Sequence, residues 1–357
     1  MADTRVIKRL AVKVGSNILA DKNGLLDTEL ISNLTRQLSD LRNSGVEVIL
    51  ISSGAVASGK GIFKPKSKTD SVGFRQMWSS LGQVRLIQTY TDLLKQHGLM
   101  CAQVLVTKDD FRSRQHYLNI KNCFFILLKN GIIPIVNEND VVSVTELMFT
   151  DNDELAGLVS TMLSVDALYI LTNVNGVLKQ GDGTEVIREI LPGQKEFEKH
   201  IQKGKSDFGR GGMLTKIHIA RKVAEAGIEV RIANGRNENI LHDLLEDNAE
   251  CTRFIPTSGK SSIKKWLAHT EGYEKGAVTI NEGVVQALMS EKATSILPVG
   301  VVDVSGNFDR GDIIKIYTEK HEEIGVGMAQ YNADAARRKM GMQRQRPVIH
   351  YDYLFLK

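Results

Sequence analysis

Short apolar stretches alternate with longer amphipathic ones along the first 255 residues, and this alternation limits the possible folds more than any other feature. Most of the short stretches are apolar on both faces, which is typical of parallel strands covered by helices on both sides. The longer stretches have the apolar spacing of helices that face a core. We therefore expect a doubly wound α/β domain, a mainly parallel sheet sandwiched by helices, with its functional site at the carboxyl ends of the strands.

Predicted strands and helices follow each other in the order that builds parallel βαβ units. The strand candidates are Leu10–Val14, Val46–Ile51, Ala102–Val106, Ile132–Val136, Ala167–Leu171 and Ile228–Ile232. The helix candidates are Asp27–Asn43, Asp70–Gln96, His116–Lys129, Asp153–Leu163 and Leu214–Ala226.

The sequence changes character near residue 258. Residues 259–275 are polar, rich in lysine and weakly periodic, as in a linker. Strand-like runs then return, among them AVTI, SILPVGVVDV, DIIKIYT and IGVGMAQY, with turns at Ser305–Asn307 and Asp309–Gly311. We predict an α/β domain over residues 1–258 and a small β-rich domain over residues 276–357.

Composition excludes several classes of protein. No apolar run approaches the roughly 20 residues of a membrane span, and the N-terminal residues lack the apolar core of a signal peptide. We therefore expect a cytoplasmic protein without membrane contact. Cys101, Cys123 and Cys251 are odd in number and far apart, which predicts buried, reduced thiols. The histidines lack ligand spacing, so we predict no metal site, and a net charge of +4 favours anionic small molecules only weakly.

The segment GRGGMLTK, residues 209–216, is the first candidate for chemistry. Three glycines in four positions free the backbone for turns closed to other residues, and a helical pattern follows at once. A glycine turn at a helix start aims unpaired N–H groups outward, which suits an anion. Lys216 falls in the first helical turn, where its charge opposes the helix dipole. An ordinary flexible loop is the alternative, and this stretch alone does not decide between them.

A second glycine-rich segment, SGAVASGKG, follows the strand-like run VEVILIS and nearly completes a nucleotide-binding P-loop. Its next residue is Gly61, at the position where that loop needs a hydroxyl to bind magnesium. The interior AVAS is also typical of a helix start. We therefore reject the P-loop and keep Ser53 and Gly54 as an anion site at a strand end.

Lys13 interrupts an apolar strand near its carboxyl end, and Gly15 and Ser16 follow after Val14. A lysine in a central strand is costly to bury without a counter-charge. Two interpretations stay open. The strand lies at an edge with Lys13 in water, or Lys13 lies where strand ends and glycine turns meet.

The runs VNENDVVS and TDNDELAG are dense in amides and carboxylates. The first follows a predicted strand, which brings Asn137 and Asp140 to the functional edge of the sheet. In the second, Asp151, Asn152 and Asp153 begin a helix, where such residues also serve as caps. Capping explains one or two of these residues but not all of them. The group suits a polar substrate that carries an amino group.

Two lysines, glycine turns and a carboxylate together suit phosphoryl transfer, because fixed cations and N–H groups stabilise the charge on a transferred phosphoryl group. At this point the chain resembles the amino acid kinase family. VKVGS, SSGAVASG, GQVRLIQTY, NENDVVS, DNDELAG, LTNVNGV and GGMLTK are similar to that family's landmarks in order and spacing. The segment from Gly276, including SGNFDRGDII, resembles a PUA domain.

The resemblance implies ATP-dependent phosphorylation of the γ-carboxylate of L-glutamate, the first step of proline biosynthesis, with magnesium arriving on ATP. Lys13 and Lys216 would then neutralise the transferring phosphoryl group, and Asp153 would hold both lysines. The implied glutamate-binding residues are Ser53, Gly54, Asn137, Asp140 and Asn152, with Asp140 against the substrate ammonium. The implied ATP-binding residues are Lys13, Gly15, Ser16, Thr172, Asn173, Gly211, Gly212, Met213, Leu214, Thr215 and Lys216.

The resemblance also implies partners: a homo-oligomer (dimer or tetramer), feedback inhibition by proline, and a glutamyl phosphate reductase that consumes the product. Asn173, Arg210 and Leu214 depart from the residues frequent in the family.

Two other functions stay open. One is a kinase of another amino acid or acylamino acid. The other is an RNA-binding protein led by its PUA domain, which a basic group supports: Arg337, Arg338, Lys339, Arg344 and Arg346. We favour a solvated helical face there, because aromatic residues for base stacking are few.

Overall fold

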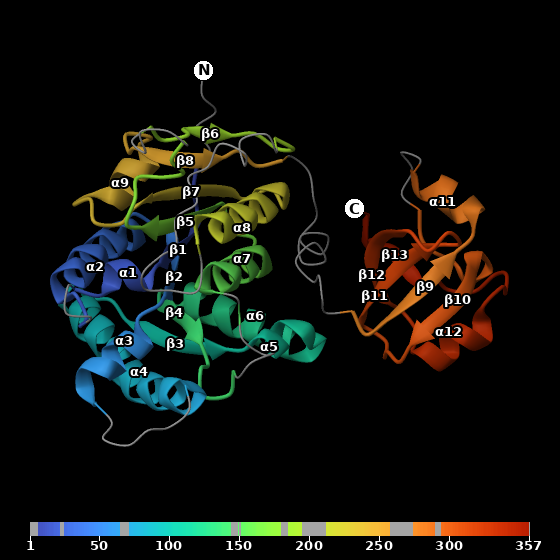
Figure 1. Cartoon of the computed structure of the whole chain (residues 1–357), viewed down its shortest axis with the longest axis horizontal. Helices are drawn as coiled ribbons and strands as arrows, with labels where there is room; N and C mark the ends of the chain where they lie inside the picture. Colours follow the sequence, from blue (N-terminus) through green and yellow to red (C-terminus); the bar gives the residue numbers. More distant parts are fainter. Residues whose placement is uncertain are drawn as a thin grey trace. The chain divides into compact units, whose positions relative to one another are not determined.

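The computed structural model describes residues 6–21, 25–64, 71–143, 149, 151–179, 185–194, 212–257, 274–289 and 294–356. The chain divides into two compact units (Figure 1). The first comprises residues 1–110 and 119–258, and the second comprises residues 111–118 and 259–357. The predicted linker, 259–275, lies almost wholly outside the described residues, so the domain boundaries stay a prediction.

The first unit is built on an eight-stranded sheet with the order β3-β4-β2-β1-β5-β7-β8-β6. Its strands are β1 (Arg9–Val14), β2 (Glu47–Ser52), β3 (Cys101–Val106), β4 (Ile133–Glu138), β5 (Ala167–Thr172), β6 (Glu189–Ile190), β7 (Glu229–Asn234) and β8 (Cys251–Phe254). Neighbours from β3 to β7 pair in parallel, whereas β8 runs antiparallel to β7. The predicted mainly parallel sheet is confirmed. Strands β8 and β6, which the sequence pattern did not indicate, extend one edge.

Helices cover both faces of this sheet (Figure 1). On one side lie α1 (Ser16–Leu19), α2 (Thr28–Asn43), α3 (Ala55–Ile62), α4 (Ser71–Gln96) and α9 (Ile240–Leu245). On the other side lie α6 (Arg114–Lys129), α7 (Asn152–Leu163) and α8 (Met213–Glu225), with the short α5 (Lys108–Arg112) before them. The predicted helices are all present, and their starts and ends differ by one or two residues, as helix ends commonly do.

Strand β1 runs through the middle of the sheet, between β2 and β5. Leu10, Val12 and Val14 point to the face covered by α2 and α4, where they belong to the apolar core. Side chains alternate along a strand, so Lys13 points to the opposite face, on which α7 packs. Lys13 is only 4% exposed. The edge-strand interpretation is therefore wrong.

Helices α3 and α4 approach each other backbone to backbone through two glycines. A Cβ atom at Gly59 would lie 1.8 Å from the carbonyl oxygen of Trp78, and one at Gly82 would lie 1.7 Å from that of Ala55. Gly59 is the second glycine of the rejected P-loop motif, and its role is this helix contact. Lys60, the lysine of that motif, is exposed in the last turn of α3. The rejection of the P-loop is thereby confirmed.

The second unit is a five-stranded sheet with the order β10-β9-β11-β12-β13. Its elements are β9 (Gly276–Ile280), α11 (Glu282–Met289), η3 (Pro298–Gly300), β10 (Val301–Gly306), β11 (Ile313–Thr318), β12 (Glu323–Ala329), α12 (Ala333–Lys339) and β13 (Ile349–Leu356). Strands β9 and β11 pair in parallel and the other neighbours pair antiparallel. The predicted small β-rich unit is confirmed.

One strand prediction in this unit is wrong. The run SILPVGVVDV is not continuous, because Ile296 makes only an isolated bridge to Ile349 and the 3₁₀ turn η3 intervenes before β10. Pro298 opens that turn. Proline has a fixed φ and lacks the N–H group that a strand ladder needs.

The cysteine prediction holds only for Cys251, which is buried. Cys101 is partly buried at the edge strand β3, and Cys123 is exposed on α6. Among the described strands, β3 has a neighbour on one side only, and α6 leaves one of its faces exposed, so neither element buries all of its side chains. Within the described ranges, no helix combines the length and the apolar character that a membrane crossing requires.

Candidate active site

Asp153 joins the two predicted phosphate-binding lysines. It lies in the first turn of α7 and is fully buried. The Lys13 Nζ atom lies 2.6 Å from its Oδ1 atom, and the Lys216 Nζ atom lies 2.7 Å from its Oδ2 atom. Lys13 comes from β1 and Lys216 from the first turn of α8. Three residues that are far apart in the sequence thus meet where a strand and two helices converge.

The Asp153 carboxylate keeps its negative charge between the two lysines. Burial alone would raise the pKa of Asp153, but the charges and hydrogen bonds of Lys13 and Lys216 outweigh burial and lower it to about 2. The carboxylate therefore stays ionised at physiological pH. Two ammonium groups share one carboxylate, so the trio carries an excess positive charge. A buried ion pair is weak evidence for stability, whereas fixed cations suit a phosphoryl group that gains charge.

Asp151 lies beside the trio and caps α7. Its Oδ1 atom accepts hydrogen bonds from the N–H groups of Asp153 and Glu154, at 2.9 and 3.1 Å. Its Oδ2 atom is buried and has no hydrogen-bond partner among the described residues. Burial and the charge of Asp153 raise the pKa of Asp151 to about 6, against the opposing effect of the lysines. The sequence pattern predicts the cap, but it gives no signal for the unpartnered oxygen.

A polar cluster from three elements adjoins the lysine pair. Asn152, the first residue of α7, donates from Nδ2 to the Ser53 Oγ atom at 2.9 Å and to the Asn137 Oδ1 atom at 3.0 Å. Ser53 follows β2, and Asn137 is the second-last residue of β4. Gly54 follows Ser53 and caps α3 with a φ of 101°, a left-handed conformation that favours glycine. The structure brings these predicted glutamate-binding residues together.

Asp140 has partners that the sequence analysis did not include. Arg75, in the first turns of α4, contacts an Asp140 carboxylate oxygen and, at 3.0 Å, the Glu138 Oε2 atom. Ser79 donates to the other Asp140 oxygen at 2.9 Å. The Oε1 atom of Glu138 accepts from the Ser143 hydroxyl at 2.7 Å. A signal for this arrangement did exist, since two carboxylates on one sheet edge need a counter-charge, but nothing in the sequence indicated which arginine supplies it.

The predicted ATP-binding residues that the structure describes lie at the ends of β1 and β5 and at the start of α8. Gly15 and Ser16 follow β1, and a Cβ atom at Gly15 would lie 3.7 Å from the Lys13 Nζ atom. Thr172 ends β5 and is mostly buried, with its hydroxyl 3.3 Å from the Asn173 Oδ1 atom. The first turn of α8 holds the remaining described members: Gly212, Met213, Leu214, Thr215 and Lys216. Gly211 lies outside the described residues.

Gly212 does not need the special backbone freedom that we expected. Its φ of −83° and ψ of 177° are accessible to any residue. Gly212 instead contributes to the site as the N-cap of α8, where it makes no side-chain hydrogen bond. The first-turn N–H groups therefore have no side-chain oxygen from the cap residue to bind.

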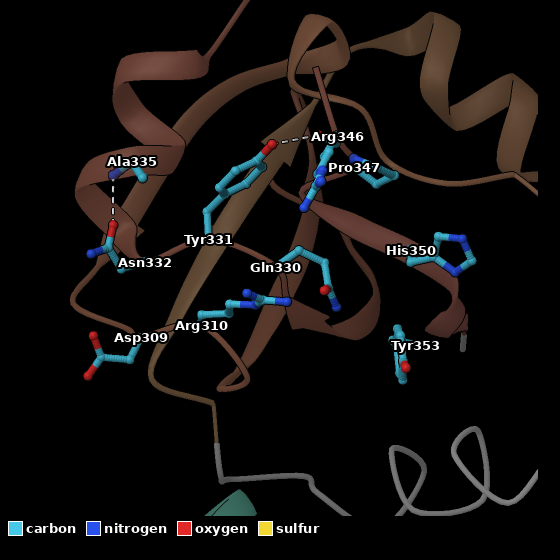
Figure 2. A pocket seen from close by; sticks show the side chains of 10 residues that line it. All are labelled: Asp309, Arg310, Gln330, Tyr331, Asn332, Ala335, Arg346, Pro347, His350 and Tyr353. Atoms are coloured by element: carbon cyan, nitrogen blue, oxygen red, sulfur yellow. Dashed lines mark hydrogen bonds between the residues drawn. The ribbon is translucent and has the colours of Figure 1, made fainter. Parts of the chain in front are cut away.

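The second unit contains a pocket of about 850 Å³ (Figure 2). Arg310 and Arg346 extend toward its middle, and Tyr331 and Tyr353 flank it. The other lining residues are Asp309, Gln330, Asn332, Ala335, Pro347 and His350. Of the predicted basic group, Arg346 lines this pocket, whereas Arg337 bonds the carbonyl oxygens of Val304 and Gly306 within the unit.

Two families match the chain over separate ranges. Residues 8–234 match the amino acid kinase family, and residues 276–350 match the PUA domain. The glutamate 5-kinase of Bacteroides thetaiotaomicron is 52% identical over 355 residues, which cover 98% of this chain and 98% of the relative. The glutamate 5-kinase of Chlorobaculum tepidum is also 52% identical, over 353 residues and 98% of each chain. That of Dehalococcoides mccartyi is 36% identical over 344 residues, 94% of this chain and 91% of the relative.

Proposed function

The chain belongs to the amino acid kinase family, and from this premise we propose that it is a kinase that transfers the γ-phosphoryl group of ATP to the γ-carboxylate of L-glutamate. The product is glutamyl 5-phosphate, and the reaction is the first step of proline biosynthesis. The observation that carries the proposal is the Asp153 carboxylate between the Lys13 and Lys216 ammonium groups. The names of the relatives, which span nearly the whole chain, support glutamate as the acceptor.

The two lysines perform the electrostatic part of the reaction. An oxygen of the glutamate γ-carboxylate attacks the γ-phosphorus in line, the bond from phosphorus to the β,γ-bridging oxygen breaks, and ADP leaves with the electron pair. Charge spreads over the phosphoryl oxygens during transfer, and fixed cations stabilise it without covalent chemistry by the protein. Lys13 and Lys216 supply those cations. Asp153 acts through them as a positioning residue, because it fixes both Nζ atoms.

The polar cluster places the acceptor. Ser53, Asn137 and Asn152 present a hydroxyl and two amides next to the lysine pair, and these groups suit carboxylate oxygens and an amino group. Asp140 supplies a negative charge for the substrate ammonium. Gly15, Ser16, Thr172, Asn173 and the start of α8 line the side from which ATP enters.

ATP brings Mg²⁺, and the donor set includes one suitable protein oxygen. Asp151 Oδ2 is a buried carboxylate oxygen without a hydrogen-bond partner among the described residues, and Mg²⁺ prefers such ligands. Asp151 would hold the ion beside the lysine pair. The ion would neutralise phosphate charge there.

The proposal extends to the surroundings of the enzyme. We expect a cytoplasmic homo-oligomer, a dimer or a tetramer, that proline inhibits by feedback. An acyl phosphate hydrolyses readily, so a glutamyl phosphate reductase that consumes it at once is the expected partner. Each of these remains a prediction.

The test is ADP release by the full chain with ATP and Mg²⁺ across a panel of acids: L-glutamate, N-acetyl-L-glutamate and L-aspartate, each with and without proline. We expect release with L-glutamate alone and its reduction by proline. Preference for N-acetyl-L-glutamate or L-aspartate would favour the alternative hypothesis, a kinase of another amino acid or acylamino acid. ADP release that depends on none of the three acids would contradict the proposal.

A further inference from the structure

Two acidic side chains lie next to each other at the end of β4, and a single guanidinium group bridges them. The Nη2 atom of Arg75 contacts both Glu138, at 3.0 Å, and Asp140. The side chains of Glu138 and Asp140 are only 6% and 7% exposed, and that of Arg75 is 20% exposed. Among the described residues, two carboxylates share one guanidinium, which leaves an excess negative charge where water cannot screen it well.

This acidic pair and the lysine trio sit at opposite ends of one hydrogen-bonded path. Asn152, next to Asp153 in α7, donates to the Asn137 Oδ1 atom at 3.0 Å. The same oxygen accepts the N–H group of Glu138 at 2.9 Å. Positive charge therefore lies at one end of the path and negative charge at the other. An amino acid has the complementary arrangement, with a side-chain carboxylate at one end and an ammonium group at the other.

We infer that Arg75 is a positioning residue for the acceptor, because it fixes the Asp140 carboxylate in the place where the substrate ammonium binds. This inference rests on the proposed function. It assigns to α4 a part in substrate binding that the motifs of the sequence did not include.

The physical reason is the cost of two neighbouring buried carboxylates. Burial raises the pKa of Glu138, as does the charge of Asp140, whereas Ser143, the Phe149 N–H group and Arg75 lower it. Among the residues that the structure describes, neutral Ser79 and Ser143 also donate to the two carboxylates, and Gln83 donates to the backbone carbonyl of Glu138. Without the guanidinium, the Glu138 carboxylate takes up a proton more readily. As pH falls, protonation of Glu138 then removes part of the negative charge that faces the substrate ammonium group.

The experiment compares three variants of the full chain. Arg75→Met removes the charge, Arg75→Lys retains it, and Arg85→Met makes the same change at an exposed position of the same helix. Because one nitrogen of Arg75 contacts both carboxylates, an ammonium group can take its place. KM for glutamate, KM for ATP and kcat are measured between pH 6.5 and 8.5, and circular dichroism checks folding.

We expect Arg75→Met to raise KM for glutamate about tenfold or more, with KM for ATP within about threefold. Its KM for glutamate should rise further as pH falls, more steeply than in the unmodified chain. Arg75→Lys should restore most of the loss, and Arg85→Met should match the unmodified chain. Inhibition by glutarate, which lacks the ammonium group, should be the same in Arg75→Met and the unmodified chain.

Other outcomes overturn the inference. A pH-independent loss of kcat with unchanged KM for glutamate would mean that Arg75 only supports the fold. Weaker glutarate inhibition in Arg75→Met would mean that Arg75 binds the substrate carboxylate directly. If Arg75→Met fails to fold, Arg75→Lys decides. A pH-independent rise of its KM for glutamate, equal to the rise of its inhibition constant for glutarate, would contradict the inference. If the unmodified chain itself shows no glutamate-dependent ADP release, the proposed function fails, and the inference fails with it.

Discussion

At the scale of single residues, the lysine trio concentrates the chemistry. Lys13 and Lys216 reach the same carboxylate from opposite ends of the first unit's sequence, with side chains 5% and 13% exposed. Each is thus largely shielded from water, which strengthens its interaction with a phosphoryl group. The residual exposure of Lys216 leaves an approach from the side of α8.

We expect Lys13→Ala or Lys216→Ala to lower kcat by roughly 10²-fold or more, because each change removes a cation that stabilises the transition state. The measurement is steady-state ADP release with glutamate. Lys60→Ala is the matched control, because Lys60 completes the P-loop-like motif but lies exposed at the end of α3. Near-normal turnover in both site variants, or a comparable loss in Lys60→Ala, would refute this assignment.

Asn152 belongs to the acceptor side of the site. Asn152→Ala removes the amide that bonds Ser53 and Asn137, so KM for glutamate should rise about tenfold or more while KM for ATP changes little. Kinetics with each substrate varied in turn measure both constants. Equal effects on the two would move Asn152 out of the acceptor pocket.

Asp151 makes the stability of the fold depend on pH. Its pKa is raised from an ordinary value of 3.8 to about 6, so the protonated form fits the folded state better than the ionised form. Stability from this residue is present below pH 4 and is lost as pH rises through 6. Asparagine resembles the protonated form and also caps helices well.

Asp151→Asn should therefore stabilise the metal-free protein, by a margin that grows by about 1–2 kcal/mol between pH 4.5 and pH 7.5. Urea unfolding at both pH values measures it. Asp27→Asn is the control, because Asp27 caps α2 but is partly exposed and pairs with Arg236. A margin that stays constant with pH, or one that Asp27→Asn shares, would count against the assignment.

At the scale of elements, the sheet and the contact between α3 and α4 set the geometry of the site. Strands β1, β2 and β4 are parallel neighbours, so Lys13, Ser53 and Asn137 approach the same edge. Helix α4 carries Arg75 and Ser79 to that edge. Its position depends on the close approach of two helices at Gly59 and Gly82.

We expect Gly82→Ala to destabilise the protein by about 1–3 kcal/mol, because the new Cβ would meet the Ala55 carbonyl oxygen and push the helices apart. Thermal unfolding followed by circular dichroism measures the loss. Ser80→Ala, at an exposed position of the same helix, should change stability by less than about 0.5 kcal/mol. A Gly82→Ala protein as stable as Ser80→Ala would show that the helices tolerate the added methyl group.

At the scale of the whole molecule, the candidate active site lies in the first unit and the arginine-lined pocket lies in the second (Figure 2). Arg310 and Arg346 give that pocket positive charge, and its tyrosines offer ring faces. These features are what the RNA-binding alternative requires, although most of the basic group that first suggested it lies elsewhere. One double variant distinguishes the glutamate kinase hypothesis from the RNA-binding hypothesis.

We expect Arg310→Ala with Arg346→Ala to leave glutamate turnover within about twofold, because neither residue belongs to the site that holds the lysines. Gel-shift assays with single-stranded RNA at 50 and 200 mM salt test the alternative with the same protein. Binding by the unmodified chain that falls with salt and disappears in the double variant would favour an RNA-binding role. We expect no such binding.

Local pattern and composition were enough to predict much of this protein. Strand and helix positions follow from apolar periodicity, and the parallel sheet and its functional edge follow from their alternation. Lys13 was visible as a charge within an apolar strand, Lys216 as a charge that opposes its helix dipole and Asp153 as a member of a dense polar run. The link between the three came from the resemblance to the family. Strands β8 and β6 and the break at Pro298 were missed, because short edge strands and turns carry little periodic signal.

Pairings between distant elements were decided only by the tertiary structure. Arg75 lies more than sixty residues from Glu138 and Asp140, and helical periodicity does not specify which cation reaches a given carboxylate. The unpartnered oxygen of Asp151 depends on what packs around it, and Gly59, which makes the α3–α4 contact, belonged to a segment that resembled a nucleotide loop. Sequence patterns encode which face of each element is buried. Which side chains then meet depends on how the elements pack, and that is a property of the assembled fold.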